Sequence, residues 1–333
     1  MRKKILTLIL CTVVIITQVS CSSNEPVSKT GFYLNTNCQI DILDKSKSQG
    51  EEIIDGAFKL IGELENQLSR TVESSDIYKI NHAKGKPVEV KDETVKLIKQ
   101  GVKISEETNG EFDITVGKLT ELWGFSDPEP KKPADKDIKK AAATVGYKNI
   151  KIQGNKVSLT NPDTWLDLGA TAKGYIADRA SEYVESKGVK SAVINLGGNI
   201  VTIGRKTDGD KPWKIGIEAP YSDRKEIVGA VQMEDQTVVT SGTYERFFEE
   251  NGKKYHHILD TKTGYPVDSD ITAISILSKK GNSGMSDVLS TTSLLLGKER
   301  AIKFIEKQEG FEYMIIDSQG KTTQSAGFNM EKK

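Results

Sequence analysis

Residues 166–178 read LDLGATAKGYIAD, and this stretch joins an apolar strand end, a turn of small residues and the start of a helix. Gly169, Ala170 and Ala172 allow a ligand to come close to the backbone. The first backbone N–H groups of the helix have no partner within it, and Lys173 adds a positive charge beside them. The stretch is typical of an anion-binding corner, although the same composition also describes an ordinary strand-to-helix turn.

The composition is ordinary for a globular protein. The chain has 333 residues, of which 36% are hydrophobic and 28% are charged, and this is enough for one large domain or two smaller ones. The 47 Lys and Arg residues balance the 47 Asp and Glu residues, so no net positive charge draws the chain to nucleic acid. We therefore expect no nucleic-acid partner.

The amino terminus is typical of an export signal. Three basic residues precede an apolar run, residues 5–16, that is too short to span a membrane comfortably. Cys21 then follows Val-Ser, a junction that resembles the bacterial lipobox, in which the cysteine is lipidated. This predicts a signal peptide over residues 1–20, a tether over 21–29, a domain over 30–333, and a protein anchored by lipid to the outer face of the cell membrane. A plain secretory signal with a chance cysteine is the alternative.

The rest of the chain mixes two periodicities. Apolar residues recur with helical spacing in some segments and alternate with polar residues in others. The predicted helices are 50–69, 92–108, 172–186, 285–297 and 299–305; the predicted strands are 31–43, a hairpin over 148–159, 192–200, 213–218, 226–232, a strand from 238, a strand from 255 that includes His256 and His257, 271–278 and 312–317.

Two patterns bear on metal binding. Alternation along a strand puts His256 and His257 on opposite faces, which disfavours a zinc site made by both. Asp287 and Thr291 are four residues apart on a predicted helix and share a face. Their oxygens suit Mg²⁺, with phosphate oxygens and water completing the shell. The alternative is a solvated aspartate and a threonine that bonds its own helix.

An ordered set of short segments resembles the ApbE family of FAD:protein FMN transferases. Each is a weak signal alone, but together they span nearly the whole chain after the signal. They are LNT at 34–36, LSR at 68–70, FDITVG at 112–117, LWGF at 122–125, DLGA at 167–170 with AKG at 172–174, NLGGN at 195–199, TSG at 240–242, HILDTKTGYP at 257–266 and DVLST at 287–291.

The resemblance implies a fold and a set of site residues. The fold is a T-fold-like α+β body of mostly antiparallel sheet with packed helices, and FAD lies in a central cleft. The implied FAD contacts are Leu34, Thr71, Glu111, Phe112, Asp113, Asp167, Lys173 and Leu259, and the implied Mg²⁺ ligands are the Ala170 carbonyl, Asp287 and Thr291, with Ser290 as a further candidate.

The resemblance also implies the reaction. A serine or threonine hydroxyl of a partner protein attacks the phosphorus on the FMN side of FAD, and AMP leaves. His257 is the candidate to take the hydroxyl proton, because its ordinary pKa lies near neutrality, and Asp260 is the candidate to orient it. The expected partner is an exported protein of an electron-transfer system. A Mg²⁺-dependent FAD pyrophosphatase and a flavin-binding lipoprotein without transfer activity are the alternatives.

Overall fold

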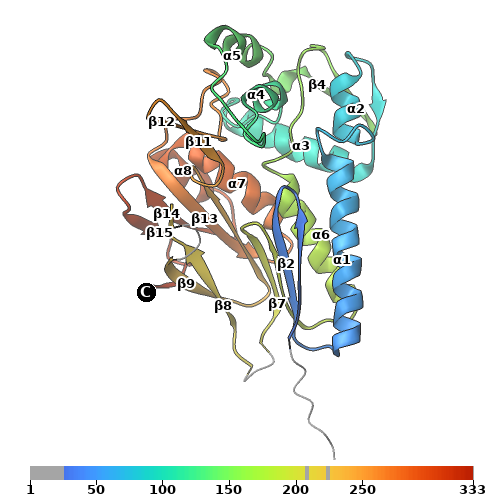
Figure 1. The fold of residues 1–333 in the computed structure, drawn as a ribbon, viewed down its shortest axis with the longest axis vertical. Helices are drawn as coiled ribbons and strands as arrows, with labels where there is room; N and C mark the ends of the chain where they lie inside the picture. Colours follow the sequence, from blue (N-terminus) through green and yellow to red (C-terminus); the bar gives the residue numbers. More distant parts are fainter. Residues whose placement is uncertain (1–25, 207–209, 223–225, 333) are drawn as a thin grey trace, which may run out of the picture.

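The computed structural model describes residues 26–206, 210–222 and 226–332, and its centre is one large sheet (Figure 1). Eight strands lie in the order β1-β2-β6-β7-β10-β13-β14-β15, and each neighbouring pair is antiparallel. These strands are β1 (Val27–Tyr33), β2 (Thr36–Ile42), β6 (Ser191–Leu196), β7 (Asn199–Gly204), β10 (Gln236–Gly242), β13 (Ile271–Lys279), β14 (Phe311–Asp317) and β15 (Thr322–Gln324). The predicted α+β class with a mostly antiparallel sheet is confirmed.

Three smaller antiparallel sheets complete the strands. One joins β8 (Trp213–Glu218), β9 (Ile227–Met233) and β16 (Met330–Lys332). Another joins β3 (Val88–Glu89), β4 (Ile150–Gln153) and β5 (Lys156–Leu159), which includes the predicted hairpin over 148–159. The third is the hairpin of β11 (Phe247–Glu250) and β12 (Lys253–His256).

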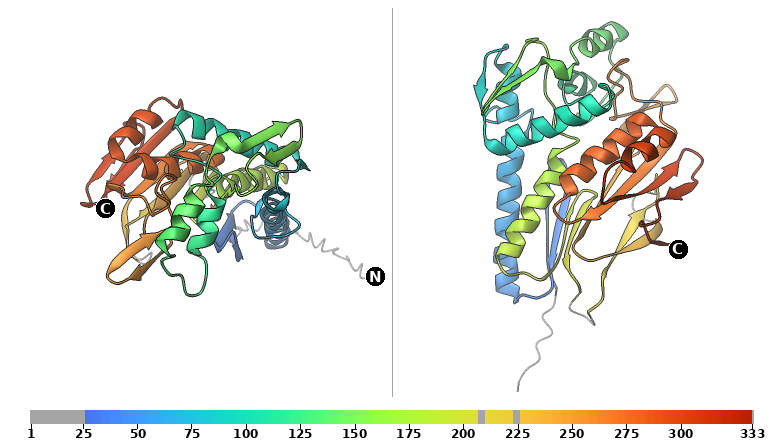
Figure 2. Two further views of the ribbon diagram at one scale, coloured as in Figure 1. Left: turned by 90° about the horizontal axis from the view of Figure 1, so that it is seen from above. Right: turned by 180° about the vertical axis from the view of Figure 1, so that it is seen from behind.

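Helices α1 (Lys47–Leu68), α6 (Ala172–Ser186) and α7 (Ser283–Leu296) lie side by side, with α6 in contact with both of the others (Figures 1 and 2). The apolar residues of α1 recur every three or four positions, and this stripe is buried in the main core. The remaining helices are α2 (Asp76–His82), α3 (Asp92–Glu107), α4 (Gly117–Trp123), α5 (Asp135–Ala142), α8 (Lys298–Ile305) and the short 3-10 helix η1 (Tyr147–Asn149).

The helix predictions hold to within three residues, but four strand predictions are wrong. The segment 192–200 contains a hairpin turn, since β6 ends at Leu196 and β7 begins at Asn199. The segment 31–43 is a hairpin rather than one strand, because Leu34 and Asn35 adopt φ angles of +56° and +55° and turn the chain between β1 and β2. The strand predicted from 255 ends at His256, since β12 stops there. The stretch before α6 is not a strand either.

The Asn81 side chain of α2 makes two of the backbone hydrogen bonds that a neighbouring strand would make to that stretch. Its side-chain amide donates to the Leu166 carbonyl at 2.9 Å and accepts from the Leu166 N–H at 2.7 Å. One residue later, the Asp167 N–H donates to the Ile114 carbonyl at 2.8 Å. These bonds hold an irregular segment in place at the entrance to α6.

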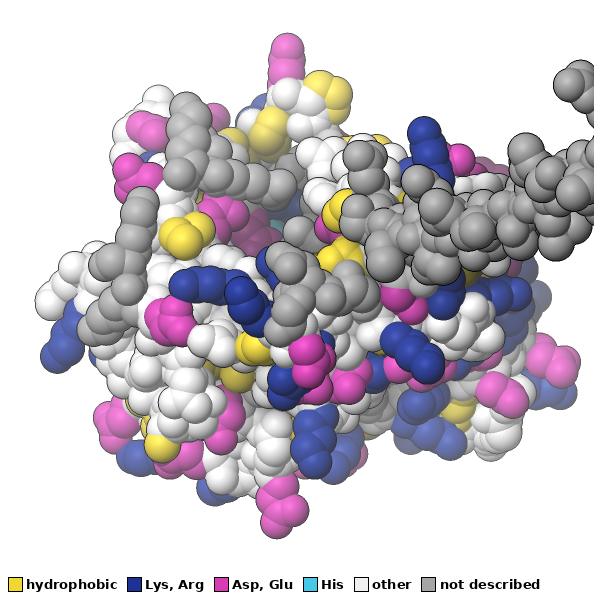
Figure 3. Space-filling model, turned by 90° about the horizontal axis from the view of Figure 1, so that it is seen from below, with side chains coloured by type: hydrophobic (Ala, Val, Ile, Leu, Met, Phe, Trp, Pro, Cys, Tyr) yellow, Lys and Arg dark blue, Asp and Glu magenta, His cyan; other side chains and the backbone are white. Residues whose placement is uncertain are grey.

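The surface mixes charges of both signs. On the face seen in Figure 3, Lys and Arg side chains lie among Asp and Glu side chains. None of the helices in the described ranges combines the length and the apolarity that crossing a bilayer requires. The predicted signal peptide, Cys21 and the first residues of the predicted tether lie outside the described residues.

Candidate functional site

The starts of α6 and α7 are joined by two buried carboxylates. Asp287 of α7 accepts the Gly174 N–H at the start of α6, at 3.1 Å. Asp178 of α6 accepts the N–H groups of Ser283 and Gly284 at the start of α7, each at 3.0 Å. Each helix therefore supplies the anion that stabilises the positive end of the other.

Gly174 is required where the two helices meet. A Cβ atom at this position would lie 2.2 Å from the Ser283 carbonyl oxygen, so no larger residue fits without separating α6 from α7. The glycine of the AKG segment therefore has a packing role, and it brings the backbone of α6 within reach of Asp287.

This arrangement leaves the Ala170 carbonyl available. In a regular helix the Gly174 N–H would donate to the carbonyl four residues earlier, that of Ala170. It donates to Asp287 instead, and no backbone N–H of the described chain donates to the Ala170 carbonyl. An unused carbonyl beside a buried carboxylate is a pair of hard oxygen ligands.

The predicted metal ligands differ in what they can offer. Asp287 is 1% exposed, and its Oδ1 lies 3.4 Å from the Lys173 Nζ. Thr291 is half-buried, and its hydroxyl has no hydrogen-bond partner in the described chain. The Ser290 hydroxyl is already engaged, since it lies 2.8 Å from the Ser241 hydroxyl of β10 and donates to the Asp287 carbonyl.

These residues fit a hard divalent cation. In the described part of the chain, no three His, Cys, Asp or Glu side chains gather as a metal cluster would. The candidate set therefore has one carboxylate, that of Asp287, with the Thr291 hydroxyl and the Ala170 carbonyl. Such a set leaves room for ligand phosphate oxygens and water, the usual pattern for Mg²⁺ bound with a nucleotide.

The two adjacent histidines have different surroundings. His256 uses both ring nitrogens on the backbone: Nε2 lies 3.1 Å from the Val267 carbonyl, and Nδ1 accepts the Ile258 N–H. The Nδ1 of His257 lies 3.3 Å from the Arg246 carbonyl, and no hydrogen bond in the described chain uses its Nε2. A neutral His257 with its proton on Nδ1 therefore has a free lone pair on Nε2.

Burial lowers the pKa of His257 to about 3, and the positive charges of Arg246 and Lys173 contribute to this decrease. The imidazole is therefore neutral at physiological pH. It is a weak base in this state, and it becomes a better proton acceptor only when a bound anion raises its pKa. Lys173 belongs to the α6–α7 corner, by which we mean Ala170, Lys173, Asp287 and Thr291, and its charge is one of the causes of the lowered pKa of His257.

Asp260 does not orient His257 in this structure. Its Oδ1 accepts the N–H groups of Lys262 and Thr263, at 2.9 and 2.7 Å. The carboxylate therefore stabilises its own turn, as aspartate commonly does, and the predicted contact with His257 is absent. Leu259, just before it, is buried in a cluster that includes Trp123.

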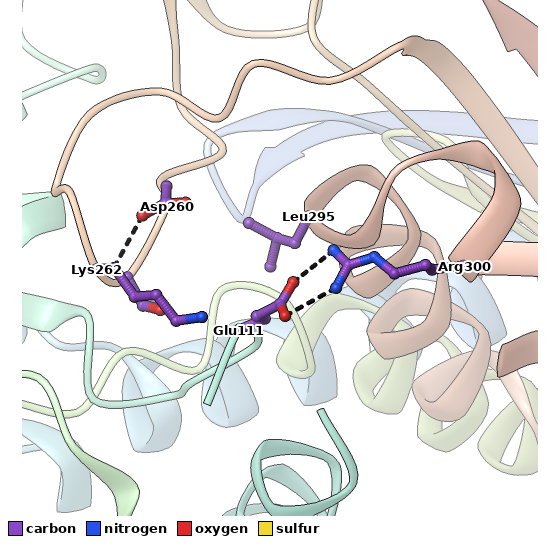
Figure 4. A pocket seen from close by; sticks show the side chains of 6 residues that line it. Glu111, Asp260, Lys262, Leu295 and Arg300 are labelled. Atoms are coloured by element: carbon purple, nitrogen blue, oxygen red, sulfur yellow. Dashed lines mark hydrogen bonds and ion pairs between the residues drawn. The ribbon is translucent and has the colours of Figure 1, made fainter. Parts of the chain in front are cut away.

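A polar pocket of about 270 Å³ lies beside this turn (Figure 4). Its walls come from three distant segments: the loop after α3, the turn after Leu259, and the junction of α7 with α8. The lining residues are Glu111, Asp260, Thr261, Lys262, Leu295 and Arg300. Two acids and two bases face the same space, so their charges balance.

Three other predicted FAD residues pack in the core or bond nearby backbone groups. Phe112 is buried in the main core. Asp113 accepts from the Thr115 N–H and hydroxyl and from the Tyr147 N–H, and burial raises the pKa of its carboxyl. Asp167 accepts the Gly169 N–H at 2.7 Å.

Leu34 and Thr71 lie at two turns. Leu34 is half-buried in the β1–β2 turn, where its N–H donates to Glu65 Oε1 at 2.9 Å. Thr71 is exposed, and its hydroxyl lies 3.0 Å from that of Ser69. No hydrogen bond or ion pair in the described chain joins either residue to the α6–α7 corner.

Residues 110–117 connect the pocket to the corner. On one side, the Gly110 carbonyl accepts the Thr261 hydroxyl at 2.7 Å. On the other, the Ile114 carbonyl accepts the Asp167 N–H, and the Gly117 N–H donates to the Trp165 carbonyl. Residues 110–117, which include the predicted Glu111, Phe112 and Asp113, thus form a continuous seam from the pocket to the segment that enters α6.

Comparison with known proteins identifies the family. The profile of the ApbE family matches residues 34–315. The chain belongs to the ApbE family. Relatives include an FAD:protein FMN transferase of Klebsiella pneumoniae, 34% identical over 83% of this chain and 85% of that protein. The crystal structure of the ApbE protein of Thermotoga maritima is similar at a TM-score of 0.82 and 32% identity, over 91% of this chain and 98% of that chain. The structure of the flavin transferase ApbE of Vibrio cholerae has a TM-score of 0.77 and 28% identity, over 91% of this chain and 98% of that chain.

Sequence reasoning missed several residues that shape this ApbE site. Asp178 ends the opening stretch, but only the structure shows that it caps α7. Arg70 belongs to the LSR segment, and its Nε lies 3.1 Å from Asp167 Oδ2. Arg300 lies in no recognised segment. The sequence offered two signals, an aspartate one turn after Gly174 and the arginine of the LSR segment.

Proposed function

We propose that this ApbE-family protein transfers FMN from FAD to a serine or threonine hydroxyl of a partner protein and releases AMP, with Mg²⁺ bound at the α6–α7 corner. The observation that carries the proposal is the freed Ala170 carbonyl at the helix start that Asp287 holds, with Lys173 paired to the same carboxylate. A neutral His257, whose pKa is lowered in part by the Lys173 charge, supports it. The names of its relatives, FAD:protein FMN transferases, support the same reaction.

The proposed FAD position follows the seam between corner and pocket, in a central cleft. The diphosphate lies at the corner, where the Lys173 ammonium offsets its charge. The ring systems extend toward the pocket and the β1–β2 turn. The proposed contacts are Leu34, Thr71, Glu111, Phe112, Asp113, Asp167, Lys173 and Leu259.

Each group of the chain has a defined task in the reaction. Ala170, Asp287 and Thr291 would hold Mg²⁺, which neutralises phosphate charge when bound. The acceptor oxygen forms a bond to the phosphorus on the FMN side, and the bond from that phosphorus to the bridging oxygen breaks, so AMP leaves with that oxygen. The acceptor proton passes to Nε2 of His257.

The products of one incubation test the proposal. The protein is mixed with FAD, Mg²⁺ and a candidate exported acceptor, and the products are separated. Covalent flavin on the acceptor with an equal amount of AMP is the expected result. Free FMN and AMP without labelled acceptor would show hydrolysis, and unchanged FAD would show binding alone; either would contradict transfer.

We also propose that Cys21 anchors the protein in the membrane by lipid. Cys21→Ala should then release the protein from the membrane fraction without changing its activity, because the tether precedes the folded body. One acyl chain binds only marginally, whereas a diacylated cysteine anchors stably. Fractionation of cells expressing both forms checks this, and a variant that stays in the membrane fraction would refute the anchor.

The protein should not flavinylate its own hydroxyls at the corner. Ser290 is fully buried and bonded to Ser241, and Thr291 is a proposed metal ligand. Neither can serve as acceptor without dismantling the site. Mass spectrometry after incubation with FAD and Mg²⁺ should find no FMN on the peptide that contains them, and a labelled peptide would contradict the assignment.

A further inference from the structure

We propose that Arg300 is a positioning residue for FAD, because it fixes the Glu111 carboxylate so that this group can accept hydrogen bonds from the dinucleotide in the pocket. The inference rests on the proposed function, since it concerns how the same site holds its substrate. Arg300 lies on α8, far from residues 108–112 in sequence, and it does not contact the α6–α7 corner in the described chain.

Arg300 and Glu111 form a bidentate ion pair. The Arg300 Nη1 lies 2.9 Å from Glu111 Oε1, and its Nη2 lies 2.6 Å from Oε2 (Figure 4). The third nitrogen, Nε, donates to the Leu296 carbonyl at the end of α7, at 2.9 Å. The guanidinium is therefore held between a helix end and the carboxylate, and it sets the plane of Glu111.

The pair leaves part of Glu111 free for a ligand. A carboxylate has about four acceptor positions, and Arg300 uses two of them. Glu111 lines the pocket and is 24% exposed in its side chain, so its remaining positions can be reached from the cavity. The balanced charges of the pocket favour a neutral part of the dinucleotide with N–H or O–H donors over a phosphate.

The loop that carries Glu111 is also held through its backbone: the Thr261 hydroxyl donates to the Gly110 carbonyl, and the Phe112 N–H donates to the Thr108 hydroxyl. Those bonds fix the backbone, whereas in the described part of the chain Arg300 alone bonds the carboxylate. Arg300 also lowers the pKa of Glu111, with a further contribution from Lys262. Without Arg300, the pKa of Glu111 should rise toward its ordinary value near 4.5.

The test compares FAD binding by the wild type and Arg300→Met, measured by flavin fluorescence. Charge-assisted hydrogen bonds of this kind predict a dissociation constant about tenfold larger in the variant. FAD affinity should also fall more steeply in the variant than in the wild type as the pH drops toward 4.5, because the wild-type Glu111 carboxyl keeps its lowered pKa. Arg179→Met is the matched control, because Arg179 forms an exposed ion pair with Glu182 on α6. It should bind FAD as the wild type does.

A charge swap separates positioning from simple clamping. Glu111→Arg combined with Arg300→Glu restores an ion pair between loop and helix but puts no carboxylate at position 111. We expect its melting temperature to recover and its FAD affinity to stay low. Recovery of both would overturn the inference, as would an Arg300→Met variant that binds FAD with unchanged affinity and pH dependence. If the wild type itself does not bind FAD, the proposed function fails, and the inference fails with it.

Discussion

Asp287→Asn should reduce FMN transfer by more than about 100-fold, because the loss of a group that only supports a metal ligand already costs about 10–100-fold. Asparagine can still accept the Gly174 N–H through its amide oxygen, so α6 and α7 stay joined. It loses the negative charge that Mg²⁺ requires of its single carboxylate ligand. Steady-state transfer rates at saturating Mg²⁺ measure the effect. Asp287→Ala removes the acceptor as well, and it should further cost about 1–3 kcal/mol of unfolding free energy for the unpaired buried N–H.

Asp178→Asn is the matched control. Asp178 is also buried, and it accepts two backbone N–H groups at the start of α7, but it is not a proposed metal ligand. This variant should lose stability and keep its transfer rate per folded molecule within a few-fold. Equal losses of rate in the two variants would indicate that the corner matters only for packing.

His257→Ala should lower the turnover number by about 100-fold or more and leave FAD affinity nearly unchanged. A general base acts in the transition state, and its removal typically costs 10²–10⁴ in rate. The structural reason is the Nε2 of His257, which no hydrogen bond in the described chain uses, since only Nδ1 contacts the Arg246 carbonyl. His256→Ala is the control, because both nitrogens of His256 bond the backbone and its loss should affect stability instead.

The pH profile gives a second readout for His257. Burial lowers its pKa to about 3, so the free enzyme holds the neutral, active form at all higher pH values. The kcat/KM for FAD should therefore show no inflection near pH 6.5, the ordinary value for histidine. A bound diphosphate would raise the pKa of the ring, so kcat can titrate at higher pH. An inflection of kcat/KM near 6.5 that disappears in His257→Ala would contradict the buried, neutral state.

The elements that could be predicted from sequence were those with strong periodicity. The long helices have continuous apolar stripes, and α6 begins and ends where the spacing placed it. The hairpin turn at Leu34 was missed because it lacks the glycine that usually marks such a turn. The segment before α6 looked like a strand because its residues are apolar. Its backbone is instead bonded by the Asn81 side chain on one side and, through a single parallel bridge, by residues 114–117.

The candidate site was predictable in its residues more than in its contacts. Asp287 and Thr291 share a helical face, so their proximity followed from spacing. The exchange of carboxylates between α6 and α7 depends on tertiary packing at Gly174, and no local pattern encodes it. The same holds for Arg300 and Glu111, which are 189 residues apart.

The most direct test of the central claim is a crystal structure with FAD and Mn²⁺ in place of Mg²⁺, in which anomalous scattering locates the metal. The account predicts one metal bound by the Ala170 carbonyl, the Asp287 carboxylate and the Thr291 hydroxyl, in contact with the FAD diphosphate. A metal bound elsewhere, or FAD whose diphosphate lies away from the α6–α7 corner, would contradict it.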